Sequence, residues 1–355
     1  MILIVPSLDP GMHGGIERVS RQVMEIFGDP QQECDLVLVS NDPADGSTRV
    51  KSYHRRYAAM LVDAMRMPLD GIEGPILCMH AGLSPVARIL AWRMKKPYCV
   101  FLHGIEVWRN LPWRTCWGLT GAGLLIANSR FTLSKFREWH LDFAGKAAEV
   151  AHLGLSSAFD GLEGKKPVGF PDGGRFVLSV GRLSLEDDYK GHGTLIHAVT
   201  ELRKNHPDVF LVLAGGGNAA AFLRQLVRVR NDAGAVVFAG SISDAELLWL
   251  YRHCAVFAML SEGEGFGLVH LEAMAQGRPC LGTHADAVAE IIEDGVTGRL
   301  VPPGDLQAAA EALDQMLGDP SALRTMGERA RQRVMEHFLQ SHFAERLQNA
   351  LKSLA

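Results

Sequence analysis

Apolar runs of strand length alternate with helix-length amphipathic patterns in two separate stretches of this 355-residue chain. The first stretch covers about residues 1–155, and the second covers about residues 176–301. Strands that alternate with helices favour parallel sheets, because a parallel strand pair needs a long crossover connection. Residues 161–174 lie between the stretches, are rich in Gly, Pro and Lys, and are typical of a linker. The sequence therefore predicts two α/β domains with parallel sheets.

The composition fits a globular protein and argues against several other classes. Hydrophobic residues make up 47% of the chain and the formal net charge is −4, so a nucleic-acid partner is not expected. We see no run of about 18 apolar residues, and the apolar start is too short for a signal peptide. These features predict a cytoplasmic protein. The six cysteines are scattered without metal-ligand spacing, which predicts reduced thiols.

Residues 261–275 carry the strongest functional pattern of the chain. Glu264 and Glu272 flank a Gly-Phe-Gly turn that follows an apolar, strand-like run. Helical spacing then begins, so the amides at the turn would form a helix N-terminus, which is a ready anion site. These amides belong to Gly265, Phe266, Gly267 and Leu268. Each glutamate also has a structural explanation when it is taken singly. Glu264 could be a solvated carboxylate in the first helical turn, and Glu272 could be an ordinary exposed helix residue.

The two glutamates with the intervening turn resemble the Glu-x7-Glu motif of the retaining glycosyltransferases of family 4, which have the GT-B fold. The resemblance implies that Glu264 contacts the donor sugar as a catalytic residue and that Glu272 binds the ribose hydroxyls. It also implies that the four turn amides hold the sugar and the distal phosphate.

The resemblance continues at a strand end in the middle of the chain. A Gly-Arg-Leu run contains Arg182, and a Lys-Gly pair at a helix start contains Lys190. Both cations would bind the donor diphosphate and stabilise the charge that develops on the leaving group. The alternative is a surface salt bridge with the acidic run 186–188. Further along, Ser243 and Glu246 come close to a capping box at the turn that would line the nucleotide base.

Two N-terminal motifs also match the family. Gly14 and Gly15 lie in a loop after the first strand, where the resemblance predicts that the backbone covers the donor diphosphate. A His-Gly-x-Glu run contains His103 and Glu106, and it implies that His103 reaches the donor sugar as a catalytic residue. Alone, each motif reads equally well as a structural turn or a structural histidine.

The same resemblance predicts the domain organisation. We expect an N-terminal, acceptor-side Rossmann-like domain over residues 1–162, completed by a crossing helix over residues 338–355. A C-terminal, donor-binding Rossmann-like domain would cover residues 163–337. In this fold the two domains face each other across a cleft.

Two features depart from the family or bear on metal use. Family members often carry a Gly-Gly-x-x-Glu run after the helix, whereas residues 283–290 keep Glu290 without the glycines. The acidic run 186–188 lacks Asp-x-Asp spacing, and Arg182 and Lys190 would take the place of a metal. No metal or other cofactor is therefore expected.

One N-terminal stretch concerns the acceptor. Trp108, Trp113 and Trp117 lie close in sequence to basic residues, namely Arg88, Arg93, Lys95, Lys96, Arg109 and Arg114. Such a mixture suits a membrane interface, and it suits a buried tryptophan cluster with solvated cations equally well.

The resemblance thus implies a retaining glycosyltransferase that moves a sugar from a UDP- or GDP-sugar to a hydroxyl. The acceptor would be a glycan or lipid-linked glycan in bacterial surface polysaccharide synthesis, with peripheral membrane contact at the inner face. Two alternatives are a GT-B sugar-nucleotide epimerase and a non-catalytic sugar-nucleotide-binding module.

Overall fold

The computed structural model describes residues 1–9, 14–27, 35–42, 50–72, 74–156, 159, 161–185, 190–230, 232 and 234–354. The chain forms two compact units. The first consists of Met1–Gly154 together with Gln340–Ala355, and the second of Leu155–Leu339. The unit boundaries thus fall at 154/155 and 339/340, against expected boundaries at 162/163 and 337/338.

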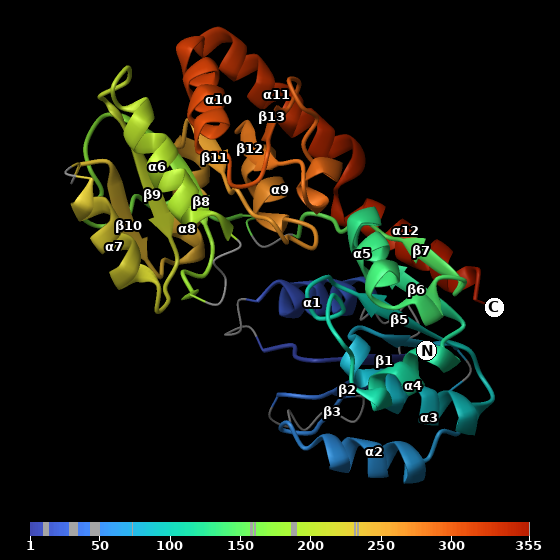
Figure 1. Ribbon diagram of the computed structural model, residues 1–355. Coiled ribbons are helices and arrows are strands. Elements are labelled where there is room, and N and C mark those ends of the chain that lie inside the picture. Colours follow the sequence, from blue (N-terminus) through green and yellow to red (C-terminus); the bar gives the residue numbers. More distant parts are fainter. Residues whose placement is uncertain are drawn as a thin grey trace. The chain divides into compact units, whose positions relative to one another are not determined.

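The first unit is built on a parallel sheet with the strand order β3-β2-β1-β4-β5-β6-β7 (Figure 1). Every strand pairing in it is parallel, as the alternating pattern predicted. The strands are β1 (Ile2–Val5), β2 (Leu36–Val39), β3 (Val50–Ser52), β4 (Ile76–Cys78), β5 (Tyr98–Leu102), β6 (Leu124–Ala127) and β7 (Ala148–Val150). The helices are α1 (Gly15–Phe27), α2 (Tyr57–Arg66), α3 (Ser84–Met94), α4 (Trp113–Gly121), α5 (Arg130–Trp139) and α12 (Gln340–Lys352), with short 3-10 turns η1 (Ala81–Leu83) and η2 (Leu141–Phe143).

Helices cover both faces of this sheet, which explains why its central strands are apolar on both sides. Val100 and Leu102 of β5 share one core with residues from four helices, α2, α3, α4 and α5. The intervening Phe101 points to the opposite face, where its ring meets Phe343 of α12 edge-on at 6.2 Å between centroids.

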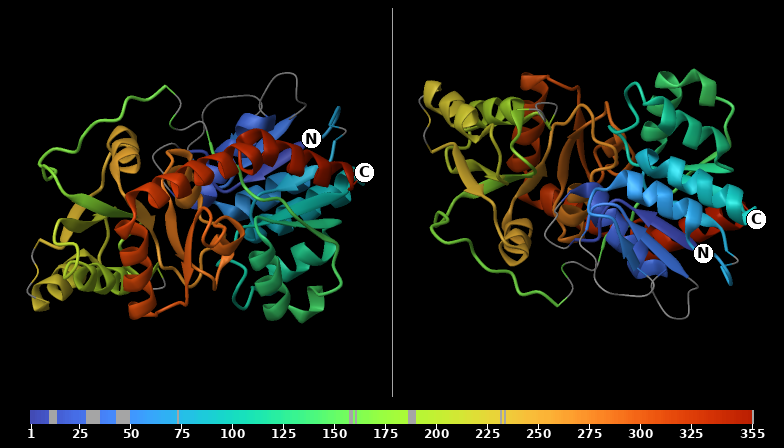
Figure 2. Two further views of the ribbon diagram at one scale, coloured as in Figure 1. Left: turned by 90° about the horizontal axis from the view of Figure 1, so that it is seen from above. Right: turned by 90° about the horizontal axis from the view of Figure 1, so that it is seen from below.

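Helix α12 is the C-terminal segment that the sequence predicted to return to the first domain. It buries Phe343, Leu347, Ala350 and Leu351. Arg346 donates to the carbonyl oxygen of His152, and Gln340 donates to Glu25, both within the first unit. Both views in Figure 2 show this last, red helix lying along the first unit.

The second unit contains a parallel sheet with the order β10-β9-β8-β11-β12-β13. Its strands are β8 (Arg175–Val180), β9 (Val209–Ala214), β10 (Val236–Gly240), β11 (Val256–Ala258), β12 (Cys280–Thr283) and β13 (Gly298–Val301). Its helices are α6 (His192–Leu202), α7 (Ala220–Val229), α8 (Asp244–His253), α9 (Leu268–Ala275), α10 (Leu306–Gly318) and α11 (Pro320–His337), and η5 (Ala287–Glu290) is a short 3-10 helix.

Two helices of the second unit begin with the side-chain caps that the sequence predicted. Ser243 and Glu246 form the predicted capping box at the start of α8. Asp305 caps α10 through the amide of Ala308. The cysteines that the structure describes are free thiols, namely Cys78, Cys99, Cys116, Cys254 and Cys280, while Cys34 lies outside the described residues. Within the described part of the chain, no helix is long and apolar enough to cross a membrane.

Candidate functional site

The segment 261–275 folds as a strand end, a turn and a helix. After β11, the chain stays buried through Leu260 and Ser261 and then turns. Gly267 adopts a left-handed conformation (φ +98°) that an L side chain rarely accepts, and it precedes α9 without a side-chain cap. The ring of Phe266 is buried and meets Phe338 edge-on, so only its backbone can serve a ligand. The first amides of α9 therefore lack a side-chain cap, which suits an anion at this helix N-terminus.

Asp286 fixes the turn that carries Glu264. Its buried carboxylate accepts hydrogen bonds from the Ser261 hydroxyl at 2.6 Å, the Glu264 amide at 3.2 Å and the Val288 amide at 3.0 Å. Burial raises the pKa of Asp286 to about 6, while these donors act in the opposite direction. A carboxylate therefore occupies a position of the 283–290 run in which family members often carry glycines. The sequence did contain a signal for this contact, because Asp is a favoured residue directly before a helix. The functional prediction did not include it.

Glu272 lies inside the second unit, only 5% exposed. Its Oε2 accepts a hydrogen bond from the Tyr251 hydroxyl at 2.8 Å, and Tyr251 itself is fully buried on α8. The reading of Glu272 as an ordinary exposed helix residue is therefore wrong. Tyr251 is a partner that the sequence did not reveal, because it lies on the preceding helix.

Arg182 and Lys190 lie at the carboxyl end of β8. Arg182 follows the strand and is exposed, whereas Lys190 is half-buried directly before α6. A Cβ built on Gly181 would lie 3.4 Å from the Lys190 ammonium nitrogen. The Lys190 ammonium group therefore lies against the end of the strand. The acidic run 186–188, the alternative partner of these cations, lies outside the described residues.

Gly191 joins this cation segment to the glutamate segment. It caps α6 with φ +67°, and a Cβ there would collide with the carbonyl oxygen of Leu260. Strands β8 and β11 are neighbours in the sheet. The Lys190 segment thus contacts both strand ends, and carboxyl ends of parallel strands are where open α/β sheets bind ligands.

A further glycine loop, residues 215–217, lies at the end of β9. Gly215 and Gly217 have φ of +141° and +153°. A Cβ on Gly215 would collide with the carbonyl oxygen of Gly181, and a Cβ on Gly217 would collide with that of Leu183. The Leu183 amide also donates to the carbonyl oxygen of Gly216. The sequence reading did not single out this loop, although three consecutive glycines after a strand were a usable signal.

In the first unit, His103 is buried at the end of β5. Its Nε2 lies 2.6 Å from the carbonyl oxygen of Met79, which can only accept, so Nε2 carries the proton and Nδ1 the lone pair. Burial lowers the pKa of His103 to about 3. The ring is therefore neutral at physiological pH and presents an acceptor nitrogen.

Glu106 holds the backbone around His103. Its Oε1 accepts from the His103 amide at 2.5 Å, and Asn128 donates to the His103 carbonyl oxygen at 2.6 Å. Burial raises the pKa of Glu106 to about 7, against the backbone donors and Arg109. Burial also lowers the pKa of the neighbouring His80 to about 4, with Arg109 adding to the effect. Glu106 is thus buried, and it binds the backbone of His103.

Gly14 and Gly15 lie at the start of α1 and are exposed. A Cβ at Gly15 would meet nothing within 4 Å, so the space beside it is open to a ligand. The preceding residues 10–13 of the predicted loop lie outside the described residues.

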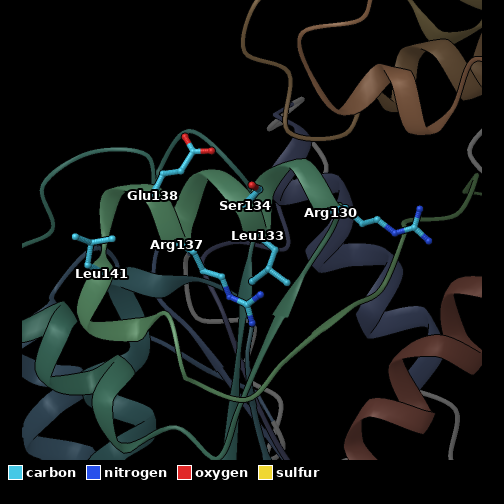
Figure 3. Close-up of a pocket in the computed structure, with 6 residues that line it drawn as sticks. All are labelled: Arg130, Leu133, Ser134, Arg137, Glu138 and Leu141. Carbon is cyan, nitrogen blue, oxygen red and sulfur yellow. The ribbon is translucent and has the colours of Figure 1, made fainter.

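A hollow of the first unit is separate from these residues. It has a volume of about 500 Å³ and is lined by Arg130, Leu133, Ser134, Arg137, Glu138 and Leu141. Figure 3 shows that these side chains come from α5 and the turn after it, so the hollow is a depression along one helix. None of the candidate residues lines it, and we assign it no role. Across the described ranges, no group of three or more His, Cys, Asp or Glu side chains could hold a metal ion.

The comparisons with known proteins identify the family. A profile described as "Glycosyl transferases group 1" matches residues 162–333. The phosphatidyl-myo-inositol mannosyltransferase of Mycobacterium leprae is 32% identical over 336 residues, which cover 86% of this chain and 84% of that protein. The chain belongs to the glycosyl transferases of group 1.

Two further matches are shorter or more distant. The N-acetyl-alpha-D-glucosaminyl L-malate synthase of Bacillus anthracis is 42% identical over 132 residues. That match spans 37% of this chain and about a third (34%) of that relative. The crystal structure of Anabaena HepE in complex with UDP and glucose matches 99% of both chains with a TM-score of 0.76 at 20% identity. The fold is therefore the GT-B architecture of two parallel-sheet α/β domains, as the sequence predicted.

Proposed function

We propose that this protein is a retaining, nucleotide-sugar-dependent glycosyltransferase that transfers a hexose from a UDP- or GDP-sugar to a hydroxyl group. The observation that carries the proposal is the contact between Gly191 and Leu260. It brings the Lys190 segment against the strand that leads to Glu264, at the carboxyl edge of two neighbouring strands. A cation and a carboxylate so arranged, beside a helix N-terminus without a side-chain cap, fit the two ends of a sugar diphosphate.

Each proposed role follows from the chemistry of the group. Arg182 and Lys190 bind the diphosphate together with the amides of residues 265–268. The buried carboxylate of Glu272 accepts hydrogen bonds from the ribose hydroxyls. Glu264 hydrogen-bonds the donor sugar. The backbone of Gly14 and Gly15 covers the diphosphate, and the neutral His103 accepts a hydrogen bond from a sugar hydroxyl.

The proposed reaction needs no covalent intermediate on the protein. The bond between the anomeric carbon and the phosphate oxygen breaks, and a bond from that carbon to the acceptor oxygen forms on the same face of the sugar. The acceptor proton leaves with the departing diphosphate. The protein then contributes positioning and electrostatic stabilisation of the leaving group.

The proposal includes no metal ion, because Arg182 and Lys190 supply the positive charge at the phosphates. We expect turnover to persist in EDTA. Activity that EDTA abolishes and Mn²⁺ restores would contradict this part of the proposal.

We further propose a glycan or lipid-linked acceptor in bacterial surface polysaccharide synthesis, with the enzyme at the cytoplasmic face of a membrane. The name of the M. leprae relative, a phosphatidyl-myo-inositol mannosyltransferase, supports a lipid-borne acceptor.

Calorimetry with free UDP and GDP tests the donor site. Lys190→Glu should weaken binding of the preferred nucleotide at least tenfold, because it puts a negative charge at the diphosphate. Lys204→Glu is the matched control, since Lys204 is an exposed lysine of the same unit that forms an ion pair with the nearby Glu201. Unchanged nucleotide affinity in Lys190→Glu would refute the assigned phosphate site.

A further inference from the structure

Three tryptophans of the first unit expose large parts of their side chains on α3 and α4. Trp92 is 75% exposed, Trp113 71% and Trp117 42%. Trp108 differs, because its half-buried ring packs edge-on against Phe131 at 5.3 Å between centroids. The sequence suited both a membrane interface and a buried tryptophan cluster, and the tryptophans of this stretch differ in their burial. Trp108 belongs to the interior, and Trp113 and Trp117 belong to the surface.

These tryptophans form one continuous surface with basic residues. The Arg88 guanidinium lies 4.4 Å from the centroid of the Trp117 ring and donates to the carbonyl oxygen of Trp117. Trp92 follows Arg88 by one helical turn, and Trp113 precedes Trp117 by one turn, so each pair shares a helix face. The Arg114 guanidinium lies 5.2 Å from the Trp113 ring. Contacts thus link Arg88 on α3 to Trp117 on α4. Helical spacing places Trp92 and Trp113 one turn away from this pair, and the exposed Lys96 follows the end of α3.

Within the described residues, no carboxylate neutralises the cations of this surface. Arg88, Arg114 and the exposed Lys96 take part in none of the ion pairs found among the described residues. Arg93, like Arg88, donates to backbone carbonyl oxygens, but these are the oxygens of Ala64 at 3.0 Å and Met67 at 2.8 Å, on the side of α2. Arg93 therefore joins α3 to the end of α2.

We infer that this indole–cation surface, formed by Arg88, Trp92, Lys96, Trp113, Arg114 and Trp117, binds an anionic lipid bilayer. Indoles favour the headgroup region, where the ring is apolar and the N–H stays wet. Arginine and lysine gain energy from anionic headgroups at the same depth. Protein interfaces have a core depleted of charge. Here a guanidinium lies against two of the three indoles, which fits lipid headgroups better than a protein partner.

The inference goes beyond sugar transfer and does not depend on the donor site. It predicts that the protein cosediments with phosphatidylglycerol-containing vesicles at low salt and that its tryptophan emission shifts to the blue. Vesicles of phosphatidylcholine alone should bind it much more weakly. Lys96→Gln with Arg114→Gln should reduce vesicle affinity about 30-fold, the equivalent of about 1 kcal/mol for each cation. Trp92→Ala with Trp113→Ala should reduce the blue shift, because Trp117 is then the one indole left of the three.

A matched control comes from the second unit. Phe222 is 57% exposed on α7, and Arg228 on the same helix is also exposed. Phe222→Ala with Arg228→Gln removes one aromatic ring and one cation and should leave vesicle binding unchanged. All variants should bind free UDP or GDP as tightly as the wild type, so that a failure of the lipid inference is distinguishable from a failure of the proposed function.

Three results would overturn the inference. One is wild-type protein that ignores anionic vesicles at low salt. Another is surface variants that bind vesicles as tightly as the wild type. The third is self-association in solution that Trp113→Ala abolishes, because a second copy would then occupy the surface.

Discussion

Glu264 and Glu272 differ in their surroundings, so their substitutions should have different effects. Glu264 lies in a half-buried turn beside Asp286, whereas Glu272 is buried against Tyr251. We expect Glu264→Ala to leave nucleotide affinity nearly intact and to lower kcat about 100-fold, the scale for losing one preorganised contact. Glu272→Gln keeps an acceptor for Tyr251 but weakens the ribose contact, so nucleotide affinity should fall while the fold is retained.

Calorimetry and steady-state kinetics on the two variants measure these effects. Equal losses of nucleotide affinity in both variants would contradict the proposed division between sugar and ribose.

Asp286 should matter for turnover through Glu264, because it binds the backbone of that turn. Asp286→Ala leaves the buried donors of Ser261, Glu264 and Val288 without their acceptor, which should cost about 2–4 kcal/mol of stability. Asp286→Asn keeps the size and one acceptor oxygen, so it should recover much of the stability and less of kcat. Urea unfolding and kcat measured together test this.

Asp305→Ala is the control for Asp286, since Asp305 also accepts from a backbone amide but does so at the exposed start of α10. It should cost about 1 kcal/mol and leave kcat unchanged. If the kcat of Asp286→Ala also remained at the wild-type level, Asp286 would be merely structural.

At the scale of elements, glycines at two helix starts should respond in opposite ways. Gly191 has a positive φ and contacts the Leu260 carbonyl, so Gly191→Ala should destabilise the second unit by more than about 1 kcal/mol. Gly15 has open space around it and begins α1, so Gly15→Ala should leave stability unchanged or slightly higher. Its turnover should nevertheless fall, because the added methyl group occupies space proposed for the diphosphate.

Thermal unfolding and a transfer assay on both variants test this contrast. Gly15→Ala with full turnover would remove the first-strand loop from the proposed donor site.

Elements were the part of the fold that the sequence predicted best. Segments with strong apolar periods became strands and helices, as in β5 and α9, and the capping box at Ser243 was found as predicted. Contacts between distant residues were not predictable in this way. Asp286 meets Ser261 across 25 positions, and Tyr251 meets Glu272 from a different helix. A single sequence contains periods and local caps, but it does not show which polar side chains pair after packing.

The same limit applied to the basic and aromatic stretch. Arg93 and Lys96 are three positions apart, yet one bonds to the end of α2 and the other is exposed. Only the packing of α2 on α3 distinguishes them.

For the whole molecule, buried titratable groups predict unequal acid stability of the two units. The folded-state pKa values of His80 and His103 lie near 4 and 3, below the ordinary 6.5. As pH falls below 6.5, the unfolded chain gains protons that the folded unit excludes, so stability falls by about 1.4 kcal/mol per pH unit for each histidine. Glu106 has a folded-state pKa of about 7, above its ordinary 4.5. It therefore acts in the opposite direction and offsets the effect of one of the two histidines.

In the second unit the effects of one buried histidine and one buried aspartate nearly cancel between pH 6 and pH 4, and burial also lowers the pKa of the half-buried His197. His270 has its pKa lowered to about 3 by burial, and Asp286 has its pKa raised to about 6. The first unit should therefore lose stability faster on acidification, with a net slope of about 1.4 kcal/mol per pH unit between about pH 6.5 and pH 4.5.

Tryptophan fluorescence can follow the first unit selectively, because Trp249 is the one tryptophan of the second unit among the chain's six. In urea titrations at about pH 7 and about pH 5, the fluorescence transition should move to lower urea on acidification. The part of the ellipticity transition that tryptophan fluorescence does not report belongs to the second unit and should move much less. Equal shifts of both signals would contradict the prediction.

The return of α12 to the first unit has a consequence for biosynthesis. The ribosome makes residues 1–154 first, but the face of β5 that carries Phe101 stays without its cover until residues 340–352 emerge. The second unit is complete within residues 155–339 and needs no later segment. Domains of a nascent chain usually fold in the order of their synthesis. Here the unit whose translation starts first is the last to be completed, and its unfinished sheet face is the one that a chaperone would meet on the ribosome.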